Sequence, residues 1–168
     1  MKNIVREMFD LLYQQNGIGL AANQVDLPYR LFILNLEADP AKGQEHVFIN
    51  PVISKRRGSV EAEEGCLSFP DIFAPVIRSE KIILSAYGLD GEELNYELSG
   101  LFARAAQHEY DHLDGVLFID RLTPTGLLSV KQALADLELE FEGDRQRGII
   151  PADQQIGARL AELEQLRT

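Results

Sequence analysis

Residues 107–112 read QHEYDH, in which His108 and His112 stand four residues apart. Four residues are about one turn of an α-helix, so a helix places both imidazoles on one face, at a separation that a single metal ion can bridge. Glu109 points close to the same face without having to bind the metal, which suits it for taking a proton from an activated water. The pattern therefore predicts a helix that carries part of a hydrolase metal site. The alternative is an ordinary helix that happens to carry two histidines.

Two histidines leave a catalytic metal site one protein ligand short, because such sites usually hold three protein ligands and keep one position for water or substrate. No histidine follows His112, although several glutamates do, and the single cysteine is Cys66, in the segment EGCLSFP. A lone cysteine is more often a small core residue than a ligand. Its neighbours favour the site, because Gly65 permits a close backbone approach and the pair Glu63 and Glu64 would be unusual beside a purely apolar position.

The apolar pattern around the motif predicts an α+β fold. Helical spacing predicts helices at residues 2–15, 99–114, 127–141 and 158–166, and short β-prone runs predict strands at 31–36, 47–49, 81–87 and 93–98. Asp90 and Gly91 supply a tight turn between the last two strands. Strands followed by a buried helix favour this class over a doubly wound parallel sheet. We expect small antiparallel or mixed sheets around a central helix that carries the HExxH motif, with a further helix at the C-terminal end.

Length and composition restrict the number of domains, the class of partner and the cellular compartment of this protein. A length of 168 residues with 45% hydrophobic content supports one core, so we expect a single domain over residues 1–168, with 142–168 as a loosely ordered tail. A formal net charge of -11 disfavours direct binding to DNA or RNA. No apolar run approaches the roughly 20 residues that span a bilayer, and no signal peptide is evident. The single cysteine excludes an internal disulfide. We expect a cytoplasmic protein without membrane association.

Three segments together resemble the motifs of the peptide deformylase family. They are GIGLAANQ at 17–24, EGCLS at 64–68 and QHEYDHLDG at 107–115, in the order and spacing of that family. The resemblance extends from the first helix to about Leu122. It implies that one divalent metal ion per chain is bound by Cys66, His108 and His112. The ion in this family is typically Fe(II), with Zn(II) or Ni(II) able to occupy the same ligands, and a thiolate with two imidazoles suits all three.

The resemblance also implies an activity and roles for individual residues. Members remove the formyl group from the N-terminal formyl-methionine of new bacterial polypeptides, so the implied substrates are N-formyl-methionyl nascent peptides, met near the ribosome. Glu109 would accept a proton from water and deliver it to the departing amine. The side-chain amide of Gln24 and the backbone N–H of Leu67 would donate to the developing oxyanion. A glutamine in that position would otherwise be an ordinary solvated residue.

A peptide-binding groove is implied beside the metal. In this family the substrate pairs as an added strand. Gly17 and Gly19 would let the main chain lie close to it, and Gly65 would serve the opposite side of the groove. The apolar groups placed to accept the methionine side chain are Ile18, Leu101 and Ala105. Arg104 is expected to lay its aliphatic stem over this pocket and keep its charged head in water. Phe73 stands where some members carry a substrate-facing arginine.

The chain begins within the first predicted helix, whereas typical members of the family have about two dozen residues before it, including an extended segment that joins the sheet. The apolar face of that helix, with Ile4, Met8 and Leu11, then needs cover. We expect a homodimer or a marginally stable domain rather than cover by the C-terminal helices.

Two other functions compete with deformylation. An HExxH peptidase that cuts internal peptide bonds would need a downstream ligand and would leave Cys66 and GIGLAANQ unexplained. A catalytically silent module would use the groove to hold peptide N-termini. Release of formate from a formyl-methionyl peptide distinguishes an enzyme from such a module.

Overall fold

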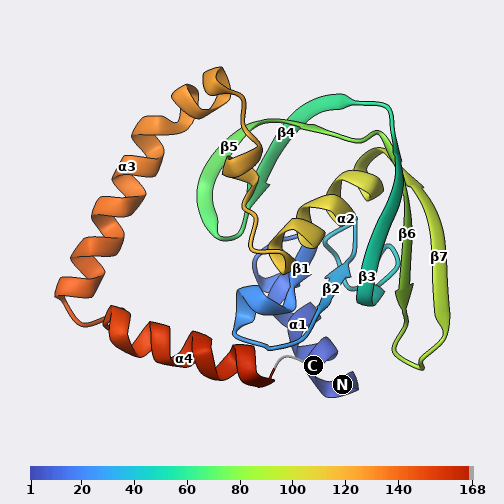
Figure 1. Cartoon of the computed structure of the whole chain (residues 1–168), viewed down its shortest axis with the longest axis horizontal. Helices are drawn as coiled ribbons and strands as arrows, with labels where there is room; N and C mark the ends of the chain where they lie inside the picture. Colours follow the sequence, from blue (N-terminus) through green and yellow to red (C-terminus); the bar gives the residue numbers. More distant parts are fainter. Residues whose placement is uncertain (167–168) are drawn as a thin grey trace.

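The computed structural model describes residues 1–166, and its helices and strands enclose one central helix (Figure 1). The helices are α1 (Lys2–Gln14), the short 3-10 helix η1 (Ala22–Val25), α2 (Gly100–Leu113), the 3-10 helix η2 (Phe118–Arg121), α3 (Pro124–Gln146) and α4 (Asp153–Leu166). The strands are β1 (Gly19–Ala21), β2 (Leu31–Leu34), β3 (His46–Arg57), β4 (Val60–Cys66), β5 (Phe69–Arg78), β6 (Lys81–Tyr87) and β7 (Glu93–Ser99).

Two antiparallel sheets surround α2. One has the strand order β1-β2-β3-β6-β7, and the other is the β4-β5 hairpin. The first sheet packs against α2 through Phe32, Phe48 and Leu84, which meet the small side chains of Ala103 and Ala106 on the helix. Alanine lets the helix axis approach the sheet closely, and this rigid contact sets the position of the HExxH face. The α+β prediction, with a central motif-bearing helix, is confirmed.

Several predicted elements have nearly the observed bounds. The first helix ends within one residue of its predicted end, and the hairpin of β6 and β7 turns at Asp90 and Gly91, where Gly91 has a φ of +81°. Ser99 occupies the N-cap position of α2, although its side chain makes no capping hydrogen bond. The segments 127–141 and 158–166 lie inside the longer helices α3 and α4.

The apolar face of α1 packs within the chain itself. Val5, Met8, Phe9 and Leu12 are buried against residues of β1, η1 and β2, whereas Leu11 stays 36% exposed. Met8 is therefore covered in the single chain. A homodimer stays a prediction.

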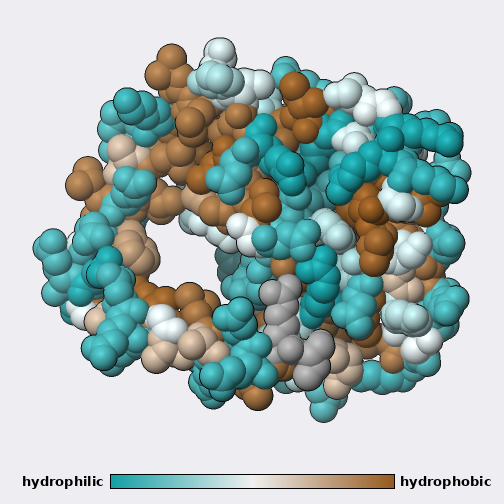
Figure 2. Space-filling model, viewed as in Figure 1, coloured by the Kyte–Doolittle hydropathy of each residue, from teal (hydrophilic) through white to brown (hydrophobic). Residues whose placement is uncertain are grey.

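The C-terminal helices form an arm beside the body (Figure 1). The first turn of α3 is capped by Thr123, whose hydroxyl accepts from the Gly126 N–H, and the helix packs on β5 through Val130, Leu134 and Leu137. Arg159 of α4 pairs with Asp26, just after η1. Figure 2 shows an opening between this arm and the body. Within residues 1–166, no helix is both long and apolar enough to cross a bilayer.

Candidate metal centre

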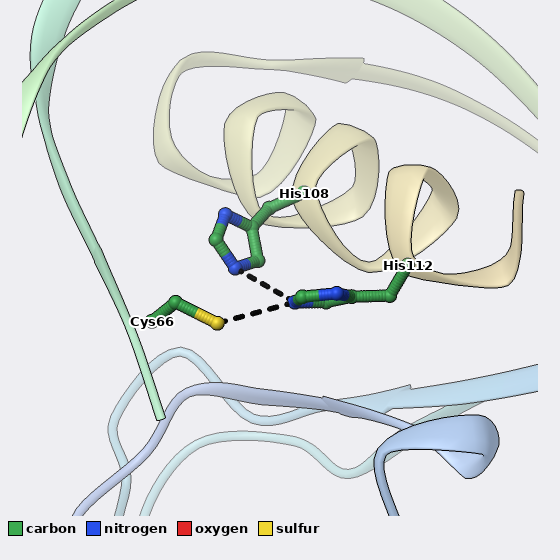
Figure 3. Close-up of side chains that lie close together, drawn as sticks. All are labelled: Cys66, His108 and His112. Carbon is green, nitrogen blue, oxygen red and sulfur yellow. Dashed lines mark hydrogen bonds between the residues drawn. The ribbon is translucent and has the colours of Figure 1, made fainter. Parts of the chain in front are cut away.

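Cys66, at the end of β4, converges with His108 and His112 of α2 (Figure 3). The Nε2 atoms of the two histidines are 3.2 Å apart, and the Cys66 Sγ lies 3.2 Å from Nε2 of His112. The three candidate ligand atoms all lie within 4.8 Å of one another. The helix brings the histidines together as its periodicity predicts, and the hairpin adds a cysteine from 42 residues earlier than His108.

The spacing fits a divalent metal ion. In tetrahedral coordination with metal to nitrogen bonds of about 2.1 Å and a metal to sulfur bond of about 2.3 Å, two nitrogens lie about 3.4 Å apart and a sulfur lies about 3.6 Å from a nitrogen. The observed separations of 3.2 Å are slightly closer than these values. One thiolate and two imidazoles form a set of three protein ligands, which leaves a position for water or substrate, as catalytic sites require.

Local backbone geometry aims Cys66 at the helix. The pairing register of β4 and β5 shifts between Gly65 and Cys66, and such an irregularity turns the cysteine side chain out of the regular pleat. The Ser68 N–H donates to the sulfur at 3.4 Å. Burial raises the pKa of the Cys66 thiol, but hydrogen bonds from His108 and His112 outweigh burial and bring it to about 5. The sulfur is therefore a thiolate at neutral pH, the form that binds metals.

Glu64 orients the first histidine. The His108 Nδ1–H donates to Glu64 Oε2 at 3.1 Å, which fixes the ring so that Nε2 faces the site. Arg78 holds the same carboxylate with two hydrogen bonds, at 2.7 and 2.9 Å. Burial raises the pKa of Glu64, but the bonds from His108 and Arg78 outweigh it and lower the pKa to about 2. The carboxylate is therefore charged and fixed in position.

The prediction that Arg104 keeps its charged head in water is wrong. Its charged head does not stay in water, because the side chain is 9% exposed and donates to Glu64 Oε1 and to the carbonyl oxygens of Val60 and Val76. With the carbonyl oxygen of Ala62 at 3.4 Å, four acceptors in β4 and β5 satisfy this guanidinium more fully than a partly hydrated cleft can, since its donors form a rigid fork. Arg104 thus lines the cavity and also joins α2 to the hairpin.

Glu109 lies beside the three ligand residues and is 4% exposed. Within residues 1–166, its Oε2 is the buried side-chain polar atom that lacks a hydrogen-bond partner. Burial is the main cause that raises its pKa, to about 7. A Cβ atom on Gly19 would collide with the Glu109 carboxylate and would lie 2.7 Å from Leu34, so glycine there makes room for this side chain. An unpartnered carboxylate with a pKa near neutrality is suited to accept a proton.

A cavity of about 530 Å³ opens in front of these groups. It is lined by the predicted residues Ile18, Gly19, Gln24, Gly65, Cys66, Leu67, Leu101, Ala105, His108 and Glu109. His112 is the one predicted site residue outside this lining, although its Nε2 lies 3.2 Å from both the Cys66 sulfur and the His108 Nε2. The structure therefore brings together residues from three separate motifs.

Gln24 and Leu67, the two residues predicted to supply oxyanion donors, both line the cavity. Gln24 accepts from the Ala21 N–H through Oε1 at 2.8 Å, and this fixes its amide so that Nε2 points to Ser68 Oγ at 3.2 Å and toward Cys66 Sγ at 3.8 Å. The side chain of Leu67 is 38% exposed at the cavity wall. Packing also requires glycine at position 65, because a Cβ atom there would lie 2.5 Å from the ring of Phe73.

Some supporting residues were not predicted. Arg78 and Asp111 form a buried ion pair at 2.6 Å behind Glu64, and the Asn23 side chain donates to the His112 carbonyl oxygen. The two adjacent acids before Cys66 are the signal that points to Glu64. No comparable signal marks Arg78, since its partners are 14 and 33 residues away.

These features define a class of protein, a metal-dependent hydrolase in which an HExxH helix and one cysteine share a cleft. Comparisons with known proteins specify the family. The model for the polypeptide deformylase family matches residues 1–127. The peptide deformylase of Rhodopirellula baltica is 39% identical over 168 residues, which are 100% of this chain and 84% of that protein. Peptide deformylase 1B of Arabidopsis thaliana is 42% identical over 160 residues, 95% of this chain, and the chain spans 58% of the length of that plant protein.

Solved structures agree. The crystal structure of Arabidopsis thaliana peptide deformylase 1B in complex with an inhibitor superposes with a TM-score of 0.80 and 43% identity, over 90% of this chain and 83% of that chain. A Synechococcus elongatus peptide deformylase in complex with actinonin gives a TM-score of 0.76 at 36% identity, over 82% and 74% of the two chains. The chain belongs to the peptide deformylase family. The predictions of the family, of a deformylase and of a Cys, His and His metal site are confirmed.

Proposed function

We propose that this chain removes the formyl group from the N-terminal formyl-methionine of new polypeptides and releases formate. The observation that carries the proposal is the buried carboxylate of Glu109, whose Oε2 has no hydrogen-bond partner among residues 1–166, in the same cavity as Cys66 and His108. A peptidase with the HExxH motif would take its third ligand downstream, whereas here Cys66 supplies it.

The chain's own residues account for the proton transfers. A divalent ion, when held by Cys66, His108 and His112, supplies Lewis-acid activation of water and of the formyl oxygen. Glu109 accepts the proton of the attacking water at its free Oε2 and then delivers it to the departing amine nitrogen. Its burial keeps bulk water from competing for the proton, and its raised pKa allows both steps near neutral pH.

Two further residues of the same cavity stabilise the charge that develops on the formyl oxygen. Gln24 Nε2 and the Leu67 N–H are donors of the correct type, and Gln24 is already fixed by its bond from Ala21, so little reorganisation is needed as charge develops. Ile18, Gly19 and Gly65 line the same cavity, and we assign them to binding of the substrate main chain and of the methionine side chain.

We further propose Fe(II) as the native ion, one per chain, with Zn(II) or Ni(II) as substitutes. A thiolate with two imidazoles accepts each of them. Activity of the iron form should then fall on exposure to air, because ferrous iron and the thiolate of Cys66 are both oxidisable. The substrates are proposed to be nascent chains met near the ribosome in a bacterial cytoplasm.

The test is release of formate from a formyl-methionyl tripeptide by protein prepared anaerobically and assayed for iron. We expect turnover with one ion per chain. Glu109→Gln is the matched variant, since it keeps the size of the side chain and should keep the ion while turnover falls by about 10²-fold or more. A wild-type protein that binds one iron and the peptide but releases no formate would instead be a silent binding module.

A further inference from the structure

A second cavity, of about 380 Å³, lies on another flank of α2 and contains none of the metal ligands. Its lining carries three guanidinium groups, those of Arg56, Arg78 and Arg121, and a single carboxylate, that of Asp111. Asp111 precedes His112 by one residue, so it projects about 100° around the helix from that ligand. The metal face and this cavity are therefore separate surfaces of one helix.

The arginines differ in how many of their donors are already used. Arg78 gives Nε and Nη2 to Glu64 and Nη1 to Asp111, so it acts mainly as a fixed positive charge. Arg121 gives Nε and Nη2 to Asp111 and keeps Nη1 free of any protein partner among residues 1–166. Arg56 gives Nη1 to Gln107, and its Nε and Nη2 have no partner in the part of the chain that the structure describes.

A buried glutamine, Gln107, holds the guanidinium of Arg56 in position. Gln107, which accepts its hydrogen bond, is 3% exposed and is itself held by three further bonds, from the Ser79 N–H and to the carbonyl oxygens of Ser79 and Ala103. This fixed amide keeps the Arg56 guanidinium at the cavity. Unused N–H donors on two arginines thus face one space of molecular size.

The charge balance of the lining favours an anion. Three guanidiniums and one carboxylate give a formal charge of +2, in a chain whose total is -11. Glu80 is the carboxylate at the edge, beside Gly58, and it opposes anion binding there. Paired guanidinium donors bind tetrahedral oxyanions by charge-assisted hydrogen bonds, which are stronger than neutral ones.

We propose that this cavity binds a small phosphate-type oxyanion, held by the free N–H groups of Arg56 and Arg121 above the fixed charge of Arg78. The small volume and the negative charge of the whole chain favour a small ligand over a nucleic acid. The source is either inorganic phosphate or the phosphate group of a small ester, and both present the same chemistry to the guanidiniums.

The test measures binding of inorganic phosphate, and separately of glycerol phosphate, to the metal-loaded full chain by titration calorimetry at constant ionic strength. Chloride is the reference anion. Arg56→Gln should raise the Kd by about 10-fold or more, as loss of charge-assisted bonds does. The matched control is Arg57→Gln, which removes the same charge from the next residue of β3 but not from the cavity lining, and it should change the Kd less than about 2-fold. Tighter binding of one of the two ligands identifies the source.

Three further outcomes decide the proposal. Glu80→Gln removes the opposing carboxylate and should tighten phosphate binding. Equal effects of Arg56→Gln and Arg57→Gln would show general electrostatic attraction and would overturn the site. Phosphate that raises the KM for a formyl-peptide, and whose Kd is unchanged in Arg56→Gln, would bind at the metal centre, and this result would also overturn the proposal.

Discussion

Removal of the Arg104 guanidinium should destabilise the domain well beyond the usual effect of losing a surface charge. Arg104→Met keeps the length and apolar stem of the side chain and removes its donors. Arg104 spans from α2 to both strands of the hairpin, with bonds to Glu64 and to the carbonyl oxygens of Val60 and Val76 at 2.8 and 2.9 Å. The side chain is 9% exposed, so water cannot readily replace these bonds.

The magnitude follows from what stays buried. Breaking a buried ion pair by removing one partner costs about 3 to 5 kcal/mol. Glu64 keeps Arg78 and His108, which places the Arg104 variant at the lower end, about 3 kcal/mol. At about 2 to 4 °C per kcal/mol for a domain of this size, the melting temperature should fall by about 6 to 12 °C.

Thermal unfolding of the metal-loaded protein, with metal content measured on the same samples, is the assay. Arg121→Met is the control, because Arg121 also gives two bonds to a carboxylate, that of Asp111, but its side chain is 46% exposed. Asp111 is 7% exposed but keeps its bond from Arg78, and the partly exposed guanidinium of Arg121 is still hydrated in the folded state, so this variant should lose less stability than Arg104→Met. The reasoning from burial is wrong if the melting temperature of Arg104→Met lies within about 2 °C of the wild type. It is also wrong if the two variants lose the same free energy of unfolding, to within ~1 kcal/mol.

Three other outcomes are expected. Cys66→Ala should lose most of its metal under conditions where the wild type holds one ion per chain, and full occupancy would remove the cysteine from the site. Glu109→Ala should keep the ion but lose turnover by on the order of 10²-fold, so simultaneous loss of metal would contradict its role as a base. The pKa of Asp111 is lowered because hydrogen bonds from Arg121 and Arg78 outweigh its burial. The ionised Asp111 therefore stabilises the folded protein above its ordinary pKa of 3.8, and this contribution is lost as the pH falls below that value. In urea unfolding, the free energy of unfolding of Asp111→Asn should fall less over this pH range than that of the wild type.

The metal ligands were predictable because the information is local. His108 and His112 are one helical turn apart, and the apolar residues of α2 specify which face is buried, so helix geometry alone brings the imidazoles together. Cys66 was identified through its motif and the lack of a later histidine. The position of its sulfur, however, depends on a register shift in the hairpin, which apolar periodicity does not reveal.

The β4-β5 hairpin itself was not predicted as strands, and its residues explain why. Pro70 and Pro75 interrupt β5, and proline is typical of edge strands because it lacks the N–H that a ladder needs. The alternation of buried and exposed positions in β5 ends at a buried arginine, Arg78, where an apolar residue would be expected. Side-chain ion pairs over long sequence separations decide this part of the fold, and single-sequence patterns carry little information about them.

These ion pairs also explain how a cavity is kept open at the metal centre. The buried core around α2 and the five-stranded sheet shares no residue with the buried core of β5, η2 and α3, against which Cys66 packs. Apolar packing between the two cores would fill the space that the substrate needs. Instead, directional hydrogen bonds from Arg104 and His108 to Glu64, and from Arg78 to Asp111, join the helix to the hairpin at fixed distances. The same bonds therefore set the separation of Cys66 from the two histidines. Arg104→Met should accordingly weaken metal binding as well as lower the melting temperature, and Arg121→Met, which leaves Glu64 untouched, should leave metal affinity close to that of the wild type.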